Sequence, residues 1–85
     1  MNKDLLSKNF LRNQITSALH TYFAKLEHAT PNDLYQLVLE EVESPLLELI
    51  MQKTNGNQSL AAKWLGLNRG TLRKLLAKYE LSDIS

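Results

Sequence analysis

The side chains best suited to contact a nucleic acid lie near the C-terminus, in the stretch "LNRGTLRKLLAKY" over residues 67–79. If this stretch is helical, its outer face carries four cations in two pairs, each pair one turn apart: Arg69 with Arg73, and Lys74 with Lys78. The major groove of DNA admits an α-helix, and arginine can bind guanine there through two hydrogen bonds. Asn68 and Thr71, at the start of the helix, can bond phosphate or base edges where the helix N-terminus also favours a phosphate.

The distribution of charge agrees with that interpretation. Residues 50–79 hold six basic residues and no acidic one, whereas residues 1–45 hold four basic and six acidic residues, although the net charge is only +1. A face charged so unevenly suits a polyanion. A protein partner for the same block would have to present an acidic surface, so a helical protein-interaction module is the alternative from another class.

The residues before this stretch fit the first half of a helix-turn-helix. Its two helices cross closely, and Ala62, backed by Ala61, supplies the small side chain needed at the crossing. Gly66 supplies a turn residue that tolerates positive φ. Asn57 is the expected cap of a helix over residues 58–65, and Asn68 of one over residues 69–79. Leucines are spaced to fill the wedge between them, namely Leu65, Leu67, Leu72 and Leu75 or Leu76.

Two longer helices precede this motif. Within residues 11–27, six apolar side chains recur at three- and four-residue spacings, which indicates an amphipathic helix. A second helix is expected from Pro31 to Thr54, capped by Thr30 and kinked at Pro45. It should end at Asn55-Gly56, where Gly56 can take the left-handed conformation. With no strand pattern anywhere, the predicted fold class is all-α with four helices per subunit.

The second helix also predicts a homodimer. Residues 34–51 contain ten aliphatic side chains spread beyond a single stripe, so the helix should be buried on more than one side. The other helices of an 85-residue chain cannot cover it fully, whereas a second copy can. The expected layout is a short, flexible N-terminal segment over residues 1–10, dimerisation helices over 11–56, the helix-turn-helix over 57–79 and a tail over 80–85.

Several function classes are excluded. The chain has no cysteine, and His20 and His28 lie eight residues apart, too far for one metal ion without further ligands, so no metal or other cofactor is expected. Glu40, Glu41 and Glu43 are interpreted as a solvated acidic face, and with no nucleophile and base in a recognisable arrangement we expect no enzyme. The chain lacks a secretory signal and a membrane-length apolar run, which predicts a cytoplasmic protein.

The block "NDLYQLVLEEVESPLLELIMQKTNGNQSLAAKWLGLNRGTLRKLLAKY", above all "LNRGTLRK", resembles the Fis (factor for inversion stimulation) family of bacterial DNA-bending nucleoid proteins. The resemblance covers roughly residues 11–79 and implies an intertwined homodimer that regulates transcription. It also implies that the two recognition helices lie closer together than one DNA turn, so that bound DNA bends.

By position, the resemblance assigns Asn68 and Arg69 to base edges. It assigns backbone contacts to Asn57, Ser59, Thr71, Arg73 and Lys74. RNA polymerase stays an open candidate partner. Recombinase activation is not expected, because only ten residues precede Leu11 and they hold no turn signal for a β-hairpin arm.

The segment "AAKWLGLNRGTLRKLL" is also similar to the DNA-binding end of nitrogen-regulator-type activators. The alternative is therefore that the chain is the DNA-binding C-terminal domain of such an activator. The initial Met1 and the complete first helix favour a free-standing protein over such an excised domain.

Overall fold

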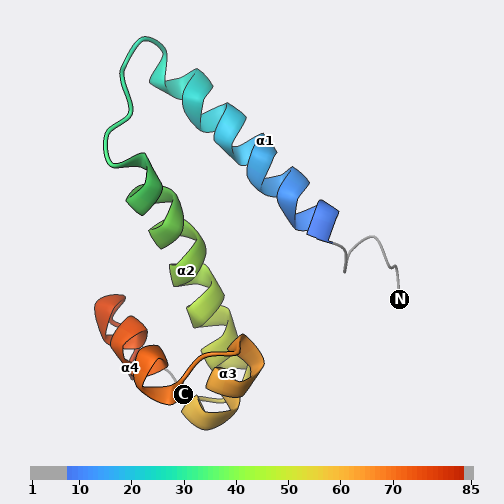
Figure 1. Ribbon diagram of the computed structural model, residues 1–85, viewed down its shortest axis with the longest axis vertical. Helices are drawn as coiled ribbons and strands as arrows, with labels where there is room; N and C mark the ends of the chain where they lie inside the picture. The colour runs from blue at the N-terminus through green and yellow to red at the C-terminus, as the bar shows by residue number, and fades with distance from the viewer. Residues whose placement is uncertain (1–7, 84–85) are drawn as a thin grey trace. The chain divides into compact units, whose positions relative to one another are not determined.

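The computed structural model describes residues 8–83, which form four helices and, within that range, no strand (Figure 1). These helices are α1 (Lys8–Leu26), α2 (Leu34–Lys53), α3 (Gln58–Leu65) and α4 (Arg69–Lys78). The chain divides into two units, Met1–Asn32 with α1 and Asp33–Ser85 with the other three helices. The all-α class predicted from the sequence is confirmed.

The first unit is a single helix with a largely uncovered apolar side. Helix α1 begins at Lys8, three residues before the predicted start, and residues 1–7 of the expected N-terminal segment lie outside the described residues. Leu11, Ile15 and Phe23 are exposed, Leu11 to 62%. Most helical stability in proteins comes from packing an amphipathic face, and α1 leaves much of its apolar face exposed.

The start of α2 differs from the prediction. Thr30 was expected as the cap and Pro31 as the first helical residue, but α2 begins at Leu34 with Asp33 before it. Asp33 has a φ of 52°, a left-handed conformation that a right-handed helix cannot include and that aspartate tolerates better than most residues. The turn at Asp33 therefore separates Thr30 and Pro31 from the helix that they were expected to start.

Helix α2 passes through Pro45 without a break, as expected from its continuing apolar pattern. It ends in a Schellman motif, in which the Asn55 N–H donates to the Gln52 carbonyl at 3.1 Å and the Gly56 N–H to the Met51 carbonyl at 2.9 Å. The first left-handed residue is Asn55, with a φ of 54°, and Gly56 follows at 79°. The predicted end of the helix is right, but two left-handed residues make the turn.

The core of the second unit lies where α3 and α4 pack on the C-terminal half of α2 (Figure 1). Six buried side chains form it, namely Leu47, Met51, Ala61, Ala62, Leu72 and Leu76. Thr54 is also buried, and its hydroxyl donates to the Ile50 carbonyl at 2.9 Å, so its polar group is satisfied. The core is small, and it is centred on the junction of the helix-turn-helix with α2.

Between residues 8 and 83, no helix has both the length and the apolar character that crossing a membrane requires.

Candidate nucleic-acid interface

Side-chain and backbone caps define each boundary of the α3–α4 pair. The Asn57 side-chain oxygen accepts from the Leu60 N–H at 3.0 Å, and the Asn68 oxygen accepts from the Gly70 N–H at 2.7 Å. Both caps were predicted, and both are confirmed. Between them Gly66 has a φ of 72°, and the Leu67 N–H donates to the Ala62 carbonyl at 2.9 Å to close a second Schellman motif.

Packing between the two helices fixes which face of α4 is free. Ala61 is fully buried and Ala62 nearly so, which confirms the small-residue crossing. On α4 the pair Leu72 and Leu76, one turn apart, is fully buried, whereas Leu75 is only partly buried. Because helix positions one turn apart share a face, the opposite side of α4 must face outward.

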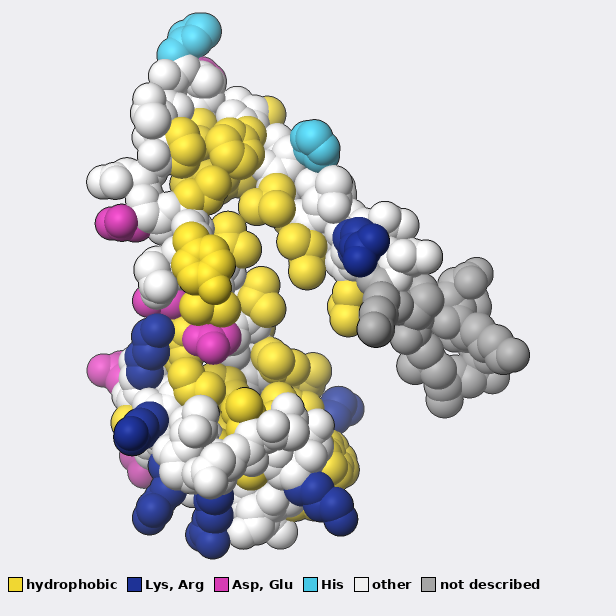
Figure 2. Space-filling model, in the orientation of Figure 1, with side chains coloured by type: hydrophobic (Ala, Val, Ile, Leu, Met, Phe, Trp, Pro, Cys, Tyr) yellow, Lys and Arg dark blue, Asp and Glu magenta, His cyan; other side chains and the backbone are white. Residues whose placement is uncertain are grey.

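That outward side carries the predicted DNA-contacting residues. Arg69, Thr71, Arg73 and Lys74 are all exposed, as are Gly70 and Ala77, whose small side chains leave the helix backbone close to the surface. Lys and Arg side chains gather at the end of the second unit where α3 and α4 lie (Figure 2). A polyanion approaching α4 from this side meets cations and a helix N-terminus, with no acidic residue in either helix of the motif.

The two capping asparagines also have groups left for a ligand. Capping uses the side-chain oxygen of Asn57 and Asn68, while the amide nitrogen of each carries two further N–H donors. Both residues are exposed, and Ser59, in the first turn of α3, is exposed too. The structure thus brings these three to the N-terminal ends of α3 and α4, where backbone N–H groups also point outward.

Lys78, one turn after Lys74, has an acidic partner on α2. Its Nζ is 3.6 Å from Glu40 Oε2 of α2, and it lies 5.2 Å from the centre of the Tyr79 ring. Both charged side chains of the pair are almost half exposed, which makes the ion pair a weak one. A phosphate contact by Lys78 would compete with this carboxylate.

Sequence reasoning missed a contact at the same end of α4. The Tyr79 hydroxyl donates to Glu43 Oε1 at 2.6 Å, between side chains 36 residues apart in the sequence. Desolvation raises the pKa of Tyr79 to about 12, helped by the hydrogen bond to Glu43 and by the negative charges of Glu43 and Glu40. The interpretation as a merely solvated acidic face is therefore wrong for Glu43, whereas the Glu40 side chain stays almost half exposed in its ion pair. Their spacing of three along α2, which puts them on one face, was the available signal.

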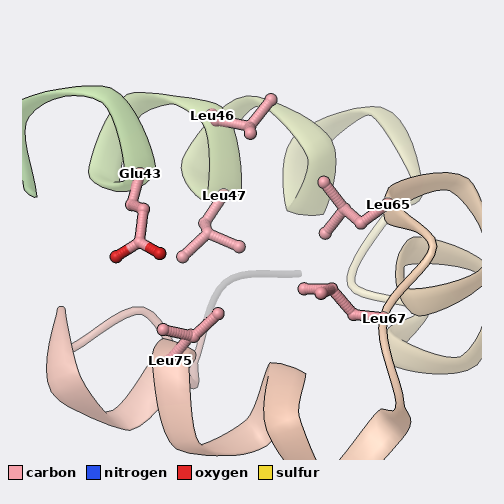
Figure 3. Close-up of a pocket in the computed structure, with 6 residues that line it drawn as sticks. All are labelled: Glu43, Leu46, Leu47, Leu65, Leu67 and Leu75. Atoms are coloured by element: carbon pink, nitrogen blue, oxygen red, sulfur yellow. The ribbon is translucent and has the colours of Figure 1, made fainter. Parts of the chain in front are cut away.

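A pocket of about 200 Å³ lies beside this contact, between α2, the α3–α4 turn and α4 (Figure 3). Five leucines line it together with Glu43, namely Leu46, Leu47, Leu65, Leu67 and Leu75. It offers one carboxylate and no nucleophile or second acid–base group. Over the part of the chain that the structure describes, no cluster of three or more His, Cys, Asp or Glu side chains could hold a metal ion.

Comparison with known proteins identifies close relatives. The sequence profile described as bacterial regulatory protein, Fis family, matches residues 38–79, which contain most of α2 and all of α3 and α4. Over 80 residues the chain is 51% identical to proteins named DNA-binding protein Fis from Proteus mirabilis, Sodalis glossinidius and Escherichia coli. The matched region covers 94% of this chain and 82% of each relative.

Proposed function

This chain belongs to the Fis family of bacterial regulatory proteins, and we propose that it binds double-stranded DNA as a homodimer, bends it and regulates transcription at the nucleoid. The observation that carries the proposal is the outward face of α4, which is cationic and free of acidic residues. This face points outward because Leu72 and Leu76 bury the opposite one. A DNA-binding regulator needs such a face rather than a catalytic pocket.

In this proposal α4 enters the major groove. Its first turn approaches the base edges through Asn68 and Arg69, and arginine can make two hydrogen bonds to guanine. Thr71, Arg73 and Lys74 bind the flanking phosphates and hold α4 in register. Gly70 and Ala77 support this arrangement, because their small side chains allow the helix backbone close to the groove.

The N-terminal end of α3 would bind the phosphate backbone at the edge of the same groove. Asn57 and Ser59 provide side-chain donors there, and the first N–H groups of α3 favour an anion. Lys78 would contribute a more general attraction, weakened by its pairing with Glu40.

Exposed apolar side chains support the dimer. Val42, Leu46 and Leu49 recur at spacings of four and three along α2, and each is more than 40% exposed. Helix α1 adds Leu11, Ile15 and Phe23, which are also exposed. A second copy that covers these surfaces would place two α4 helices about a two-fold axis, so each reads one half-site. RNA polymerase is a further candidate partner at bound promoters.

The test is the salt dependence of binding to a fluorescent duplex, measured by anisotropy over a range of salt concentrations. If each subunit neutralises about four phosphates, log affinity should fall with log salt at a slope of about −7. Binding that does not change with salt would contradict the proposal. Absence of binding at low salt would instead favour the helical protein-interaction module.

A further inference from the structure

Helix α4 is attached to the rest of its unit at two places. Near its middle, Leu72 and Leu76 are buried in the core with Ala61 and Ala62 of α3. At its C-terminal end, the next residue, Tyr79, is bonded to Glu43 of α2. Figure 1 shows the end of α4 beside α2, away from the α3–α4 turn. The direction of α4 therefore depends on a polar contact as well as on the core.

The Tyr79–Glu43 bond is the stronger part of that polar contact. At 2.6 Å it is a short hydrogen bond from a hydroxyl to a carboxylate, and both side chains are partly buried, so water competes less for them. The neighbouring Lys78–Glu40 pair at 3.6 Å is more exposed and weaker. Lys78 near the Tyr79 ring offsets part of the negative charge that the two glutamates place there.

Apolar packing leaves room for α4 to tilt on this side. The leucine-lined pocket of about 200 Å³ separates Leu47 of α2 from Leu75 of α4, and Glu43 reaches across its edge toward α4 (Figure 3). Close-packed interiors resist displacement, whereas a gap of this size lets side chains shift without overlap. Leu75 and Tyr79 pack only partly buried against the core, so the hydrogen bond adds a directional constraint at a loosely packed end of the helix.

A tilt of α4 would matter because the helix is long enough to act as a lever. A ten-residue helix is about 15 Å long, so a rotation of about 10° displaces one end by about 2.5 Å. That displacement approaches the rise of one base pair, about 3.4 Å. Since α2 carries the exposed apolar side chains Val42, Leu46 and Leu49, a bond from α4 to α2 connects the reading helix directly to the proposed dimer surface.

We propose that Tyr79 and Glu43 are positioning residues that, by fixing α4 on α2, set the spacing between half-sites that the dimer accepts. The inference rests on the proposed function, because spacing has meaning only for a dimer that reads two half-sites. Neither side chain has to touch DNA for this role.

The experiment compares Tyr79→Phe with wild type on a panel of duplexes. A half-site selected by the wild-type protein from a randomised pool is placed twice in each duplex, and the separation between the copies varies by single base pairs. Tyr79→Phe removes the hydroxyl and keeps the ring, so the unit should stay folded. Tyr35→Phe, the same chemical change on an exposed side chain of α2, is the matched control.

We expect Tyr79→Phe to reduce the affinity ratio between the best spacing and its neighbours by about threefold to tenfold, as for the net loss of one hydrogen bond of typical strength. Glu43→Gln, which keeps an acceptor without the charge, should give a smaller reduction, and Tyr35→Phe none. An unchanged ratio, including one in which binding weakens equally at every spacing, would overturn the positioning role even if thermal stability falls. If the wild type bound no duplex, the proposed function itself would fail, and this inference with it.

Discussion

Gly66, the turn residue of the helix-turn-helix, allows the cost of one substitution to be worked out from the structure. Its φ of 72° lies in the left-handed region, and a Cβ built there meets nothing within 4 Å, so Gly66→Ala creates no overlap with other atoms. The left-handed conformation costs an L-residue about 1–2 kcal/mol. Alanine also lowers the conformational entropy of the unfolded chain relative to glycine, which stabilises the folded state by about 0.4–1 kcal/mol. The free energy of unfolding should therefore fall by about 1 kcal/mol.

The assay is urea unfolding followed by circular dichroism, at one fixed protein concentration because a dimer's stability depends on concentration. Glu80→Gly is the matched variant, since Glu80 holds the equivalent position after α4 with a φ of 58°. It should change the free energy in the opposite direction by a similar amount. An unchanged stability for Gly66→Ala would refute the reasoning, because it would mean that the left-handed conformation costs alanine nothing here. A loss above about 3 kcal/mol would also refute it, because a loss of that size implies a disturbed core.

Three further predictions concern DNA reading, pH and assembly. Arg69→Ala should cost about 1–3 kcal/mol of binding free energy on the selected half-site and little on random DNA. Lys74→Ala should weaken binding to both duplexes and make the salt slope shallower by about 0.9 per half-site. Anisotropy titrations on both duplexes check these two results. Because the pKa of Tyr79 rises from 10.0 to about 12 on folding, its contribution to stability is complete below pH 10 and is lost as the pH rises through 12. Urea midpoints should therefore fall more over that range in wild type than in Tyr79→Phe. Val42→Glu should shift the protein from dimer toward monomer in sedimentation velocity. A sedimenting mass equal to that of the wild type would contradict this prediction.

The sequence predicted the helix-turn-helix in detail because its signals are local. Asn57 and Asn68 are caps within a few residues of the N–H groups that they bond, and Gly66 lies at the one turn position between two short apolar patterns. The closeness of α3 and α4 required a small residue, which identified Ala62. In each case the physical requirement and the residue that meets it are neighbours along the chain.

Two features could not be predicted in the same way. The conformation of Asp33, which moved the start of α2 past Thr30 and Pro31, has no unique sequence signal, because Thr-Pro with a following acid also fits a helix start. The Tyr79–Glu43 bond joins residues 36 positions apart, and the spacing of Glu40 and Glu43 along α2 does not tell which residue of another helix lies opposite them. The residues proposed to contact DNA stay predictions until binding is measured.

The measurement that tests the central claim most directly is a gel-shift titration on circularly permuted duplexes, with an A/T-rich site placed from one end to the middle. The account predicts a complex whose mobility depends on the position of the site, which requires that the protein both bind and bend the DNA. A shift that does not depend on position would mean that the protein binds the DNA without bending it. No shift at low salt, with wild-type protein that is folded, would contradict the claim that the outward face of α4 reads DNA.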